Sequence, residues 1–582
     1  MRILLLHAED SALTGPWAGQ KWDAVIDLAR AGWAAYERWS RALGCSVRPL
    51  DAVRDGIAEI ERVRALLQCG LGRLTDRDGL DWWELAAIMV HHRLEDLVLL
   101  RKLARSLPDD AEVWVTRAGF EAEVLRDVLG ARLHVSAPSA PRPGGLGHYV
   151  NRLRQLPSAQ VIQILGDKFD PGYRVRRRWH KRSQGGHNRV VLAPTSYVNM
   201  SRTVAGFATV LPSREFLLVA TRSSGRLQTA PGNLRQEWLA SYAGGDGREE
   251  LPRILERWEI LKKDLREVPE WSAMERFGLM DDFPRRFAEG LAIRDAWLRV
   301  FDRERVAAVL CCDDSNPHTH IPLLLAARRE LPTVACHHGA LDGRYLIKSR
   351  HADVVLAKGR MEQDYLVNFC GLAASNVQIG APAGHTSPEG ARGPEGDCIV
   401  FFSEPYEMSA GRTVEFYRDA LPRLADLAAR TGKKMAMKLH PSENLRDRQA
   451  LVARLLDDRQ RAAVQWLSGP LDQALLKRVW FGVTVQSSVA VECAVHGVPC
   501  FLCEWLDLWP YGYVTQFRKF GVGIGLRAPE EITSIPETLA RWNPSRRVAE
   551  DCCQQITPQH LDDILSGKRT PQPVPLGMQR SG

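Results

Sequence analysis

The 582-residue sequence lacks the features typical of membrane, repeat, disordered or nucleic-acid-binding proteins. No apolar run approaches the roughly 18 residues that a membrane-spanning helix needs. It contains no internal repeat and no low-complexity tract, and its formal net charge of +8 is small for this length. A dedicated nucleic-acid binder concentrates basic charge more heavily, so we expect no nucleic-acid partner. With 45% hydrophobic residues, the composition is that of a folded globular protein.

The cysteines provide no second pair of zinc ligands. Cys500 and Cys503 form a CxxC with Cys493 and His496 nearby, but a zinc site needs further ligands at suitable spacing. Cysteines within apolar segments are typical of buried small side chains, so we expect a core strand here. The first ten residues hold an apolar run too short for a signal peptide. We expect a reduced protein in the cytoplasm.

Short apolar runs alternate with longer amphipathic segments, as is typical of α/β units built on parallel strands. Residues 233–301 have helical periodicity and predict a helical insertion. The strands expected before it and after it are 3–6, 113–116, 132–135, 190–193, 216–220, 306–311, 333–336 and 354–357. Expected helices include 22–43, 82–107 and 121–129.

A Pro- and Gly-rich stretch at residues 381–397 predicts an interdomain linker. The strand–helix rhythm restarts after it, with strands expected at 398–402, 434–439, 481–485 and 499–502 and helices at 412–430, 445–456 and 488–496. We therefore expect two Rossmann-like domains that face each other across a cleft. The expected ranges are 1–380 for the N-terminal domain, 398–566 for the C-terminal domain with its closing helices, and 567–582 for a tail.

The sequence Lys438-Leu439-His440-Pro441 ends an expected strand, because Pro441 cannot continue it. In open α/β sheets, ligands bind beyond the carboxyl ends of the strands. A cation and an imidazole donor at such a place suit a diphosphate or a phosphate leaving group. A solvated strand end is the alternative interpretation.

The next strand of this domain leads into Gln486-Ser487-Ser488 and then an expected helix. Ser487 or Ser488 stands where a helix prefers an N-cap residue. The free N–H groups and the dipole at a helix start favour a bound anion. Glu492, one turn further on, can accept hydrogen bonds from a ribose or from other hydroxyls. A simple N-cap over a buried helix is the alternative.

Together these two elements resemble the His-Pro and Ser-Ser elements of bacterial surface-polysaccharide glycosyltransferases with the GT-B fold. The nearest groups are the capsule-type Kdo and sialic acid transferases and the CDP-glycerol glycerophosphotransferases of teichoic acid synthesis. The segments LPTVACHHG and HADVVLAKGRMEQDYLVNFCG are similar to the segments that precede the interdomain linker in those families. The resemblance covers about residues 306–506, and the acidic-acidic-Gly motif of sialyltransferases is absent. It implies a nucleotide-activated donor, CMP- or CDP-linked among the choices, bound by residues 438–441 and 486–492.

The resemblance also matches His338, next to Gly339, to a family histidine that faces the acceptor side. A histidine with a near-neutral pKa can take the proton of an acceptor hydroxyl as the new bond forms. Asp313 and Asp314 end the preceding strand, so one of them can orient His338 or act as the base itself. A structural histidine and an ordinary turn are the alternatives.

Two further features are candidates for binding. Glu9 and Asp10 follow the first expected strand and occupy another cleft-facing position. Residues 173–182, YRVRRRWHKR, form a basic and aromatic segment that fits an anionic membrane surface or a polyanionic acceptor, or a solvated loop. We expect peripheral contact with the inner face of the plasma membrane if the former holds.

Three functions fit these observations. The first is a glycosyltransferase that moves a sugar from a nucleotide donor to a surface polysaccharide or glycolipid, with a glycerophosphotransferase as a close variant. The second is a sugar-nucleotide epimerase, and the third is a non-catalytic protein of polysaccharide assembly. Asp313-Asp314 lacks the spacing of an Asp-x-Asp metal clamp, so we expect basic groups and helix termini, without a metal or other cofactor, to neutralise the departing phosphate.

Overall fold

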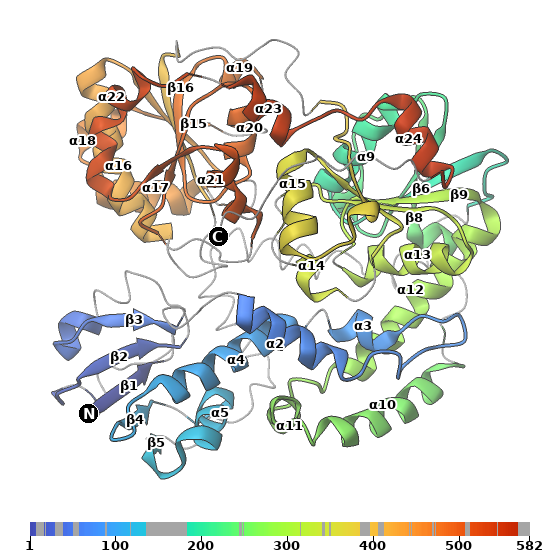
Figure 1. The fold of residues 1–582 in the computed structure, drawn as a ribbon, viewed down its shortest axis with the longest axis horizontal. Helices are drawn as coiled ribbons and strands as arrows, with labels where there is room; N and C mark the ends of the chain where they lie inside the picture. The colour runs from blue at the N-terminus through green and yellow to red at the C-terminus, as the bar shows by residue number, and fades with distance from the viewer. Residues whose placement is uncertain are drawn as a thin grey trace.

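The computed structural model describes residues 1–135, 183–384 and 396–568, apart from short gaps of which the longest are 7–16, 29–38, 51–56 and 405–412. The strands form three separate parallel sheets, each with helices packed against it (Figure 1). No helix in these ranges is long and apolar enough to cross a bilayer.

The N-terminal sheet has five strands in the order β3-β2-β1-β4-β5. Its strands are β1 (Arg2–Leu6), β2 (Ala24–Asp27), β3 (Val47–Pro49), β4 (Glu112–Val115) and β5 (Leu133–Val135). The same part of the chain forms the helices α2 (Ile57–Gln68), α3 (Trp82–Ala87), α4 (His91–Ser106) and α5 (Phe120–Leu129). The first strand lies in the middle of the sheet, which is the doubly wound arrangement.

The middle sheet has seven strands in the order β12-β11-β10-β9-β6-β7-β8. Its strands are β6 (Arg189–Thr195), β7 (Glu215–Ala220), β8 (Leu234–Trp238), β9 (Arg305–Cys311), β10 (Thr333–Cys336), β11 (Val354–Ala357) and β12 (Val377–Ile379). Its helices include α9 (Val198–Val210), α13 (Pro317–Arg328), α14 (Arg344–Ile347) and α15 (Arg360–Asp364). The strand order reverses between β6 and β9, because β7 and β8 extend the sheet on one side of β6 and β9 to β12 extend it on the other.

The C-terminal sheet has six strands in the order β15-β14-β13-β16-β17-β18, and its order reverses between β13 and β16. The strands are β13 (Cys398–Phe402), β14 (Lys434–Lys438), β15 (Val464–Leu467), β16 (Val479–Thr484), β17 (Cys500–Cys503) and β18 (Ile524–Leu526). The helices are α16 (Thr413–Thr431), α17 (Leu445–Leu455), α18 (Asp458–Ala462), α19 (Gln473–Leu476), α20 (Val489–Val495), α21 (Phe517–Phe520), α22 (Ile535–Leu539) and α23 (Arg546–Cys552).

A helical layer joins the N-terminal sheet to the middle sheet. It consists of α10 (Leu251–Leu265), α11 (Pro269–Arg276) and α12 (Phe283–Arg303), drawn in green below the middle sheet in Figure 1. Trp271 of α11 packs against Trp83 of α3, with ring centroids 4.8 Å apart. Arg294 of α12 is fully buried and pairs with Asp76 and Glu250. Breaking a buried pair leaves an uncompensated charge, so this cluster fixes residues near 76 against the layer.

The last helix, α24 (Pro558–Leu565), returns from the C-terminal unit to the middle sheet (Figure 1). Leu561 and Ile564 are buried in the same hydrophobic cluster as Leu310 and Val334 of the middle sheet. The outgoing and returning segments run side by side, because Ala381 N–H donates to Gln554 O at 2.8 Å and Ile556 N–H donates to Ala381 O at 3.0 Å. Two chain segments therefore connect the middle and C-terminal units.

The expected α/β class, with Rossmann-like sheets on either side of residues 381–397, is confirmed by this topology. The structure divides residues 1–380 between two sheets rather than one domain, and it places α24 with the middle sheet rather than with residues 398–566. The helix expected at 22–43 is wrong at its start, because residues 24–27 form β2. The helical insertion begins at α10, since residues 234–238 form the edge strand β8. Cys500 and Cys503 are buried in β17, as expected of a core strand.

We predict that Leu561→Ala destabilises the middle unit, because it removes buried apolar volume that joins α24 to β9 and β10. The expected loss in free energy of unfolding is about 2–5 kcal/mol, measured by urea unfolding. Gln559→Ala changes an exposed residue of the same helix and is the control, expected within about 0.5 kcal/mol of the parent. Equal stability of the two variants would show that α24 does not contribute to this core.

Candidate active site

The reversal of strand order in a doubly wound sheet leaves a crevice outside the carboxyl ends of two neighbouring strands, where ligands bind. In the middle sheet these strands are β6 and β9, which lead into Tyr197 and Asp313. In the C-terminal sheet they are β13 and β16, which lead into Glu404 and Gln486. The topology therefore predicts ligand sites at the same two sheet edges that carry the sequence motifs.

On the middle sheet, His338, Tyr197 and Asp313 form one hydrogen-bonded group. The Tyr197 hydroxyl donates to Asp313 Oδ2 and lies 3.2 Å from His338 Nε2 and 3.3 Å from its Nδ1. The two rings meet edge to face, with centroids 4.9 Å apart. The side chain of His338 is half-buried and that of Asp313 is buried. The structure thus brings the two candidate catalytic residues together and adds a tyrosine between them.

A backbone carbonyl orients the His338 ring. Its Nδ1 lies 3.3 Å from Cys312 O, and because a carbonyl oxygen accepts only, this contact favours the tautomer with its proton on Nδ1. Nε2 then carries the lone pair that can accept a proton. Burial, together with the neighbouring His337 and Lys358, lowers the pKa of His338 to about 3, although Asp313 raises it. The near-neutral pKa expected from the sequence is therefore wrong for the ligand-free protein, in which His338 is a neutral and weak base.

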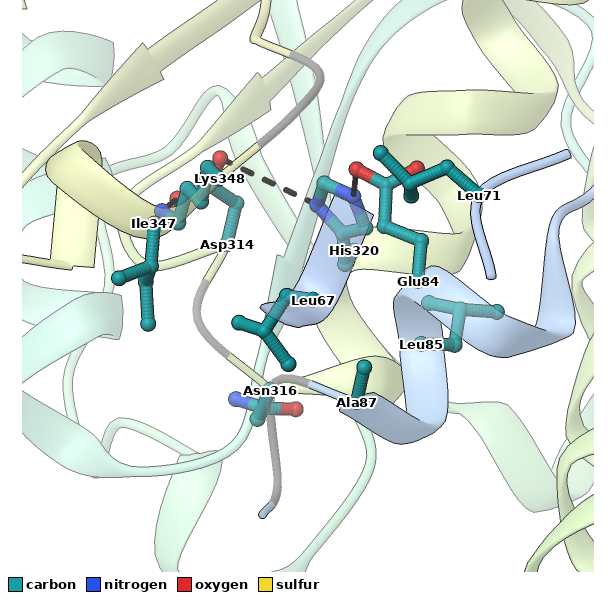
Figure 2. A pocket seen from close by; sticks show the side chains of 10 residues that line it. All are labelled: Leu67, Leu71, Glu84, Leu85, Ala87, Asp314, Asn316, His320, Ile347 and Lys348. Carbon is teal, nitrogen blue, oxygen red and sulfur yellow. Dashed lines mark hydrogen bonds and ion pairs between the residues drawn. The ribbon is translucent and has the colours of Figure 1, made fainter. Parts of the chain in front are cut away.

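Asp314, the neighbour of Asp313, lines a small buried cavity (Figure 2). There it pairs with Lys348, and His320 lies between it and Glu84 of α3, at 3.9 Å from each carboxylate. Both Lys348 and His320 lower the pKa of Asp314 against the effect of its burial. The free volume is about 20 Å³, enough for a water molecule and too small for a substrate. This cluster fixes the end of β9, and therefore Asp313, against α3 and α13.

Asp313, His337 and His338 place potential metal-ligand atoms within 4.8 Å of one another. The Nδ1 of His337 accepts a hydrogen bond from Gly339 N–H at 3.2 Å, so a neutral His337 carries its proton on Nε2. Ligation of a cation by this ring would therefore require loss of the Gly339 bond or of the Nε2 proton. At His338, by contrast, Nδ1 donates to the Cys312 carbonyl and leaves the Nε2 lone pair for a proton or a cation. The local hydrogen bonds therefore oppose a cation at His337 alone.

On the C-terminal sheet, Lys438 is the last residue of β14 and is mostly buried. Its Nζ donates to Leu439 O at 3.0 Å. Burial lowers its pKa, while Glu492 and Glu443 raise it. His440 is exposed, yet desolvation lowers its pKa. The His440 side chain is therefore open to solvent on one side and faces protein on the other. Pro441 lies outside the described residues.

Buried Glu443 holds the turn after β14. It accepts the His440 backbone N–H at 2.8 Å, the Ser403 hydroxyl at 2.7 Å and Arg448 Nε at 2.7 Å. Because Ser403 follows β13 and Arg448 lies in α17, one carboxylate joins three segments at the carboxyl edge of the sheet. The orientation of residues 438–440 is therefore set by the fold.

Buried Glu404 plays the same part for the turn after β16. Its Oε1 accepts the Thr484 hydroxyl, the Val485 N–H at 3.2 Å and the Gln486 N–H at 3.1 Å. The next residues begin α20.

Ser488 occupies the N-cap position of α20 but its side chain makes no capping bond, whereas Ser487 Oγ accepts Val489 N–H at 3.3 Å. Ser488 therefore stands at the N-cap as expected, but the hydroxyl that accepts a backbone N–H of the first turn is that of Ser487.

Glu492 of α20 interacts electrostatically with the strand ends that carry Lys438 and Lys358. Its side chain is exposed, yet desolvation raises its pKa, and the charges of Lys358 and Lys438 lower it. Lys438 ends β14, whereas Lys358 follows β11 of the middle sheet and also lowers the pKa of His338. The carboxyl edges of the two sheets are therefore close enough for their charges to interact. Lys438 and Glu492 belong to one electrostatic group, and Lys358 links it to His338.

Four contributors were not singled out from the sequence: Tyr197, Lys358, Glu404 and Glu443. The first three follow strands β6, β11 and β13 by one to two residues, so the strand-end rule that selected Lys438 could also have found them. Glu443 follows Pro441 in a turn, and no local pattern marks it. Glu9, Asp10 and the basic segment 173–182 lie outside the described residues.

The sequence matches no protein-family model and no curated protein. Among solved structures, the fold is similar to MnaA of S. aureus in complex with UDP, at 11% identity and a TM-score of 0.39, over 65% of this chain and 94% of that one. It is also similar to MurG of Acinetobacter baumannii, at 13% identity and a TM-score of 0.38, over 65% of this chain and 98% of that one. A third similar structure is the wall teichoic acid polymerase TagF, at 8% identity and a TM-score of 0.38, over 73% of this chain and 98% of that one. At these identities and scores the likeness identifies no substrate and no mechanism.

We predict that His338 makes the protein sensitive to acid. Its pKa of about 3 lies below that of an unfolded histidine, about 6.5, so the unfolded chain binds more protons between these values. Stability should therefore fall as the pH decreases below about 6.5. In His338→Gln the decrease should be smaller, because this titrating group is absent. Melting temperatures measured from pH 7.5 to 4.5 test this, and parallel curves for the two proteins would contradict it.

Proposed function

We propose that this chain is a glycosyltransferase that moves a sugar from a nucleotide-activated donor to a glycan or lipid-linked glycan acceptor. The observation that supports it most is that cations from two different sheets, Lys358 and Lys438, both lower the pKa of Glu492. Strand ends that carry cations, hydroxyls and backbone N–H groups suit a phosphate anion. A neutral imidazole paired with a carboxylate suits proton removal from a hydroxyl.

The donor would bind at the carboxyl edge of the C-terminal sheet. Lys438 would neutralise phosphate charge, and the side chain of His440 is exposed and can donate a hydrogen bond. The Ser488 hydroxyl has no hydrogen bond to any described residue and can donate to a phosphate oxygen. Glu492 can accept from donor hydroxyls. The proposed donor site comprises Lys438, His440, Pro441, Gln486, Ser487, Ser488 and Glu492.

The acceptor hydroxyl would lie beside His338 and Asp313. As the acceptor oxygen bonds to the anomeric carbon, the bond from that carbon to the phosphate oxygen breaks and its electron pair stays on the phosphate. The acceptor proton passes to Nε2 of His338, with Asp313 as the alternative base or as its partner through Tyr197. A bound phosphate anion would raise the pKa of His338 and strengthen it as a base. No metal ion takes part in this scheme.

A sugar-nucleotide epimerase is the alternative enzyme, and it would act on its nucleotide sugar with no acceptor. The helical layer and the basic segment 173–182 favour an enzyme with an acceptor over this alternative. A glycerophosphotransferase would differ by its donor, in which the acceptor oxygen bonds to phosphorus and the P–O bond to the departing nucleotide breaks. The charge of Glu492, one turn beyond Ser488, raises the pKa of Lys438. This proximity of the two motifs counts against a non-catalytic assembly protein, in which they need not lie together.

We predict that one nucleotide among CMP, CDP, UDP, GDP and TDP raises the melting temperature, because a ligand bound only by the native state stabilises it. His440→Ala and Ser488→Ala should each weaken its binding about 10- to 100-fold while they leave the unliganded melting temperature unchanged. His560→Ala and Ser545→Ala are matched controls. Ser545, like Ser488, stands at an N-cap without a side-chain capping bond. Unchanged affinity in both site variants would refute this donor site.

We predict that His338→Ala lowers the rate of transfer by about 10²–10⁴-fold, because it removes the base that takes the acceptor proton. The nucleotide affinity should stay near that of the parent, since the donor phosphates bind to the other sheet. Single-turnover transfer and calorimetric titration measure the two quantities, with exposed His187→Ala as control. Near-normal turnover in His338→Ala would assign the role to Asp313, for which Asp313→Asn is the test.

A further inference from the structure

Lys358 stands beside His338 at the edge of the middle sheet. Strands β10 and β11 pair in parallel with Cys336 opposite Leu356, so His338 and Lys358 each lie two residues beyond a paired position. Neighbouring strands are about 4.8 Å apart. A cationic side chain is therefore held next to the proposed acceptor base, at the carboxyl end of the adjacent strand.

The Lys358 side chain is oriented before any ligand binds. Its Nζ donates to Gly339 O at 3.0 Å and to Glu362 Oε1 at 3.1 Å, and its backbone N–H donates to Glu362 Oε2 at 2.7 Å. The side chain is only 15% exposed. An ammonium group has three hydrogens, and the hydrogen bonds to described residues account for two of them. One donor remains for a ligand.

Lys358 also lies at the seam with the C-terminal unit. A side chain at the next residue, Gly359, would collide with the backbone of Asp551 and Cys552, so α23 packs directly on this turn. In turn α23 contacts α20, which carries Glu492. A second contact joins the units nearby, because Tyr513 N–H donates to Leu341 O at 2.9 Å, two residues after Gly339. The charge of Lys358 accordingly acts on both His338 and Glu492.

We propose that Lys358 binds the terminal phosphate of the departing nucleotide, so that this anion is held between Lys358 of the middle sheet and Lys438 of the C-terminal sheet. The inference rests on the proposed function and adds to it the residue by which the acceptor-side unit binds the donor. When the bond from sugar carbon to phosphate oxygen breaks, the electron pair gives that phosphate an additional negative charge. Lys358 stabilises the charge as a fixed cation, gains and loses no proton, and is unchanged by the reaction.

The chemistry also explains why one cation is insufficient. Lys438 already interacts with Glu443 and Glu492. A nucleotide that leaves with two or three negative charges needs a second cation, and phosphoryl groups are commonly clamped by more than one. Since Lys358 comes from the other unit, the clamp is complete only when both units contact the same nucleotide.

The test compares two ligands on each variant: the nucleotide that stabilises the wild-type protein most, and its analogue with one phosphate fewer. Isothermal titration calorimetry gives the ratio of their affinities. Lys358→Met keeps the apolar stem and removes the charge, so it should weaken binding of the longer nucleotide about 10- to 100-fold and leave the shorter one unchanged. Lys358→Arg keeps a cation and should restore part of the ratio. Lys433→Met is the control, because Lys433 likewise donates to a backbone carbonyl, Gly396 O at 2.9 Å, but before β14.

The outcomes separate this inference from the proposed function. If no nucleotide binds the wild-type protein, the proposed function fails and the inference fails with it. If the nucleotide binds but Lys358→Met preserves the affinity ratio, the inference alone is overturned. An equal loss for both ligands also overturns it, because it would show that Lys358 merely supports the turn at Gly339.

Discussion

Burial of parallel sheets on both faces is the constraint on which this structure depends. Backbone groups within the strands are satisfied by the ladder, and side chains on both faces must be apolar, so the strands have little place for chemistry. In β13 every residue is buried, and so is every residue of β10 and β11. Polar side chains therefore gather where each strand ends. Because parallel strands end at the same edge, Tyr197, Asp313, His338 and Lys358 become neighbours although 161 positions separate the first from the last.

Buried carboxylates convert these flexible strand ends into fixed positions. Glu404 and Glu443 accept backbone N–H groups from the turns after β16 and β14, and Glu362 accepts from the turn after β11. A carboxylate that accepts several charge-assisted or backbone bonds compensates for its own burial and orders the chain around it. None of the three needs to touch a substrate. Each sets the direction of a residue that can do so, as Glu362 does for Lys358.

Most of the inner strands could be predicted from the sequence, with β2 as an exception, and most of the edge strands could not. The expected ranges 333–336, 354–357 and 398–402 coincide with β10, β11 and β13, because strands buried on both faces are continuous apolar runs. Missed strands such as β8, β12, β15 and β18 lie at sheet edges, have three to five residues and include partly exposed side chains. Such segments have no apolar run to detect. Lys438, His338 and Asp313 could be found by the strand-end rule, whereas the low pKa of His338 depends on burial and on Lys358, which are tertiary facts.

The return of α24 makes the middle unit discontinuous in sequence. Residues 183–384 form its sheet, while Ile556, Leu561, Ile564 and Leu565 complete one side of its core. A fragment cut at the linker would therefore leave an apolar surface uncovered in the N-terminal piece and an apolar helix without its partner in the C-terminal piece. The C-terminal sheet is, in effect, inserted between the sheet and the last helix of its neighbour. Exchange of the C-terminal unit between proteins would thus require two junctions, near residues 381 and 555, where the two connecting segments already lie side by side.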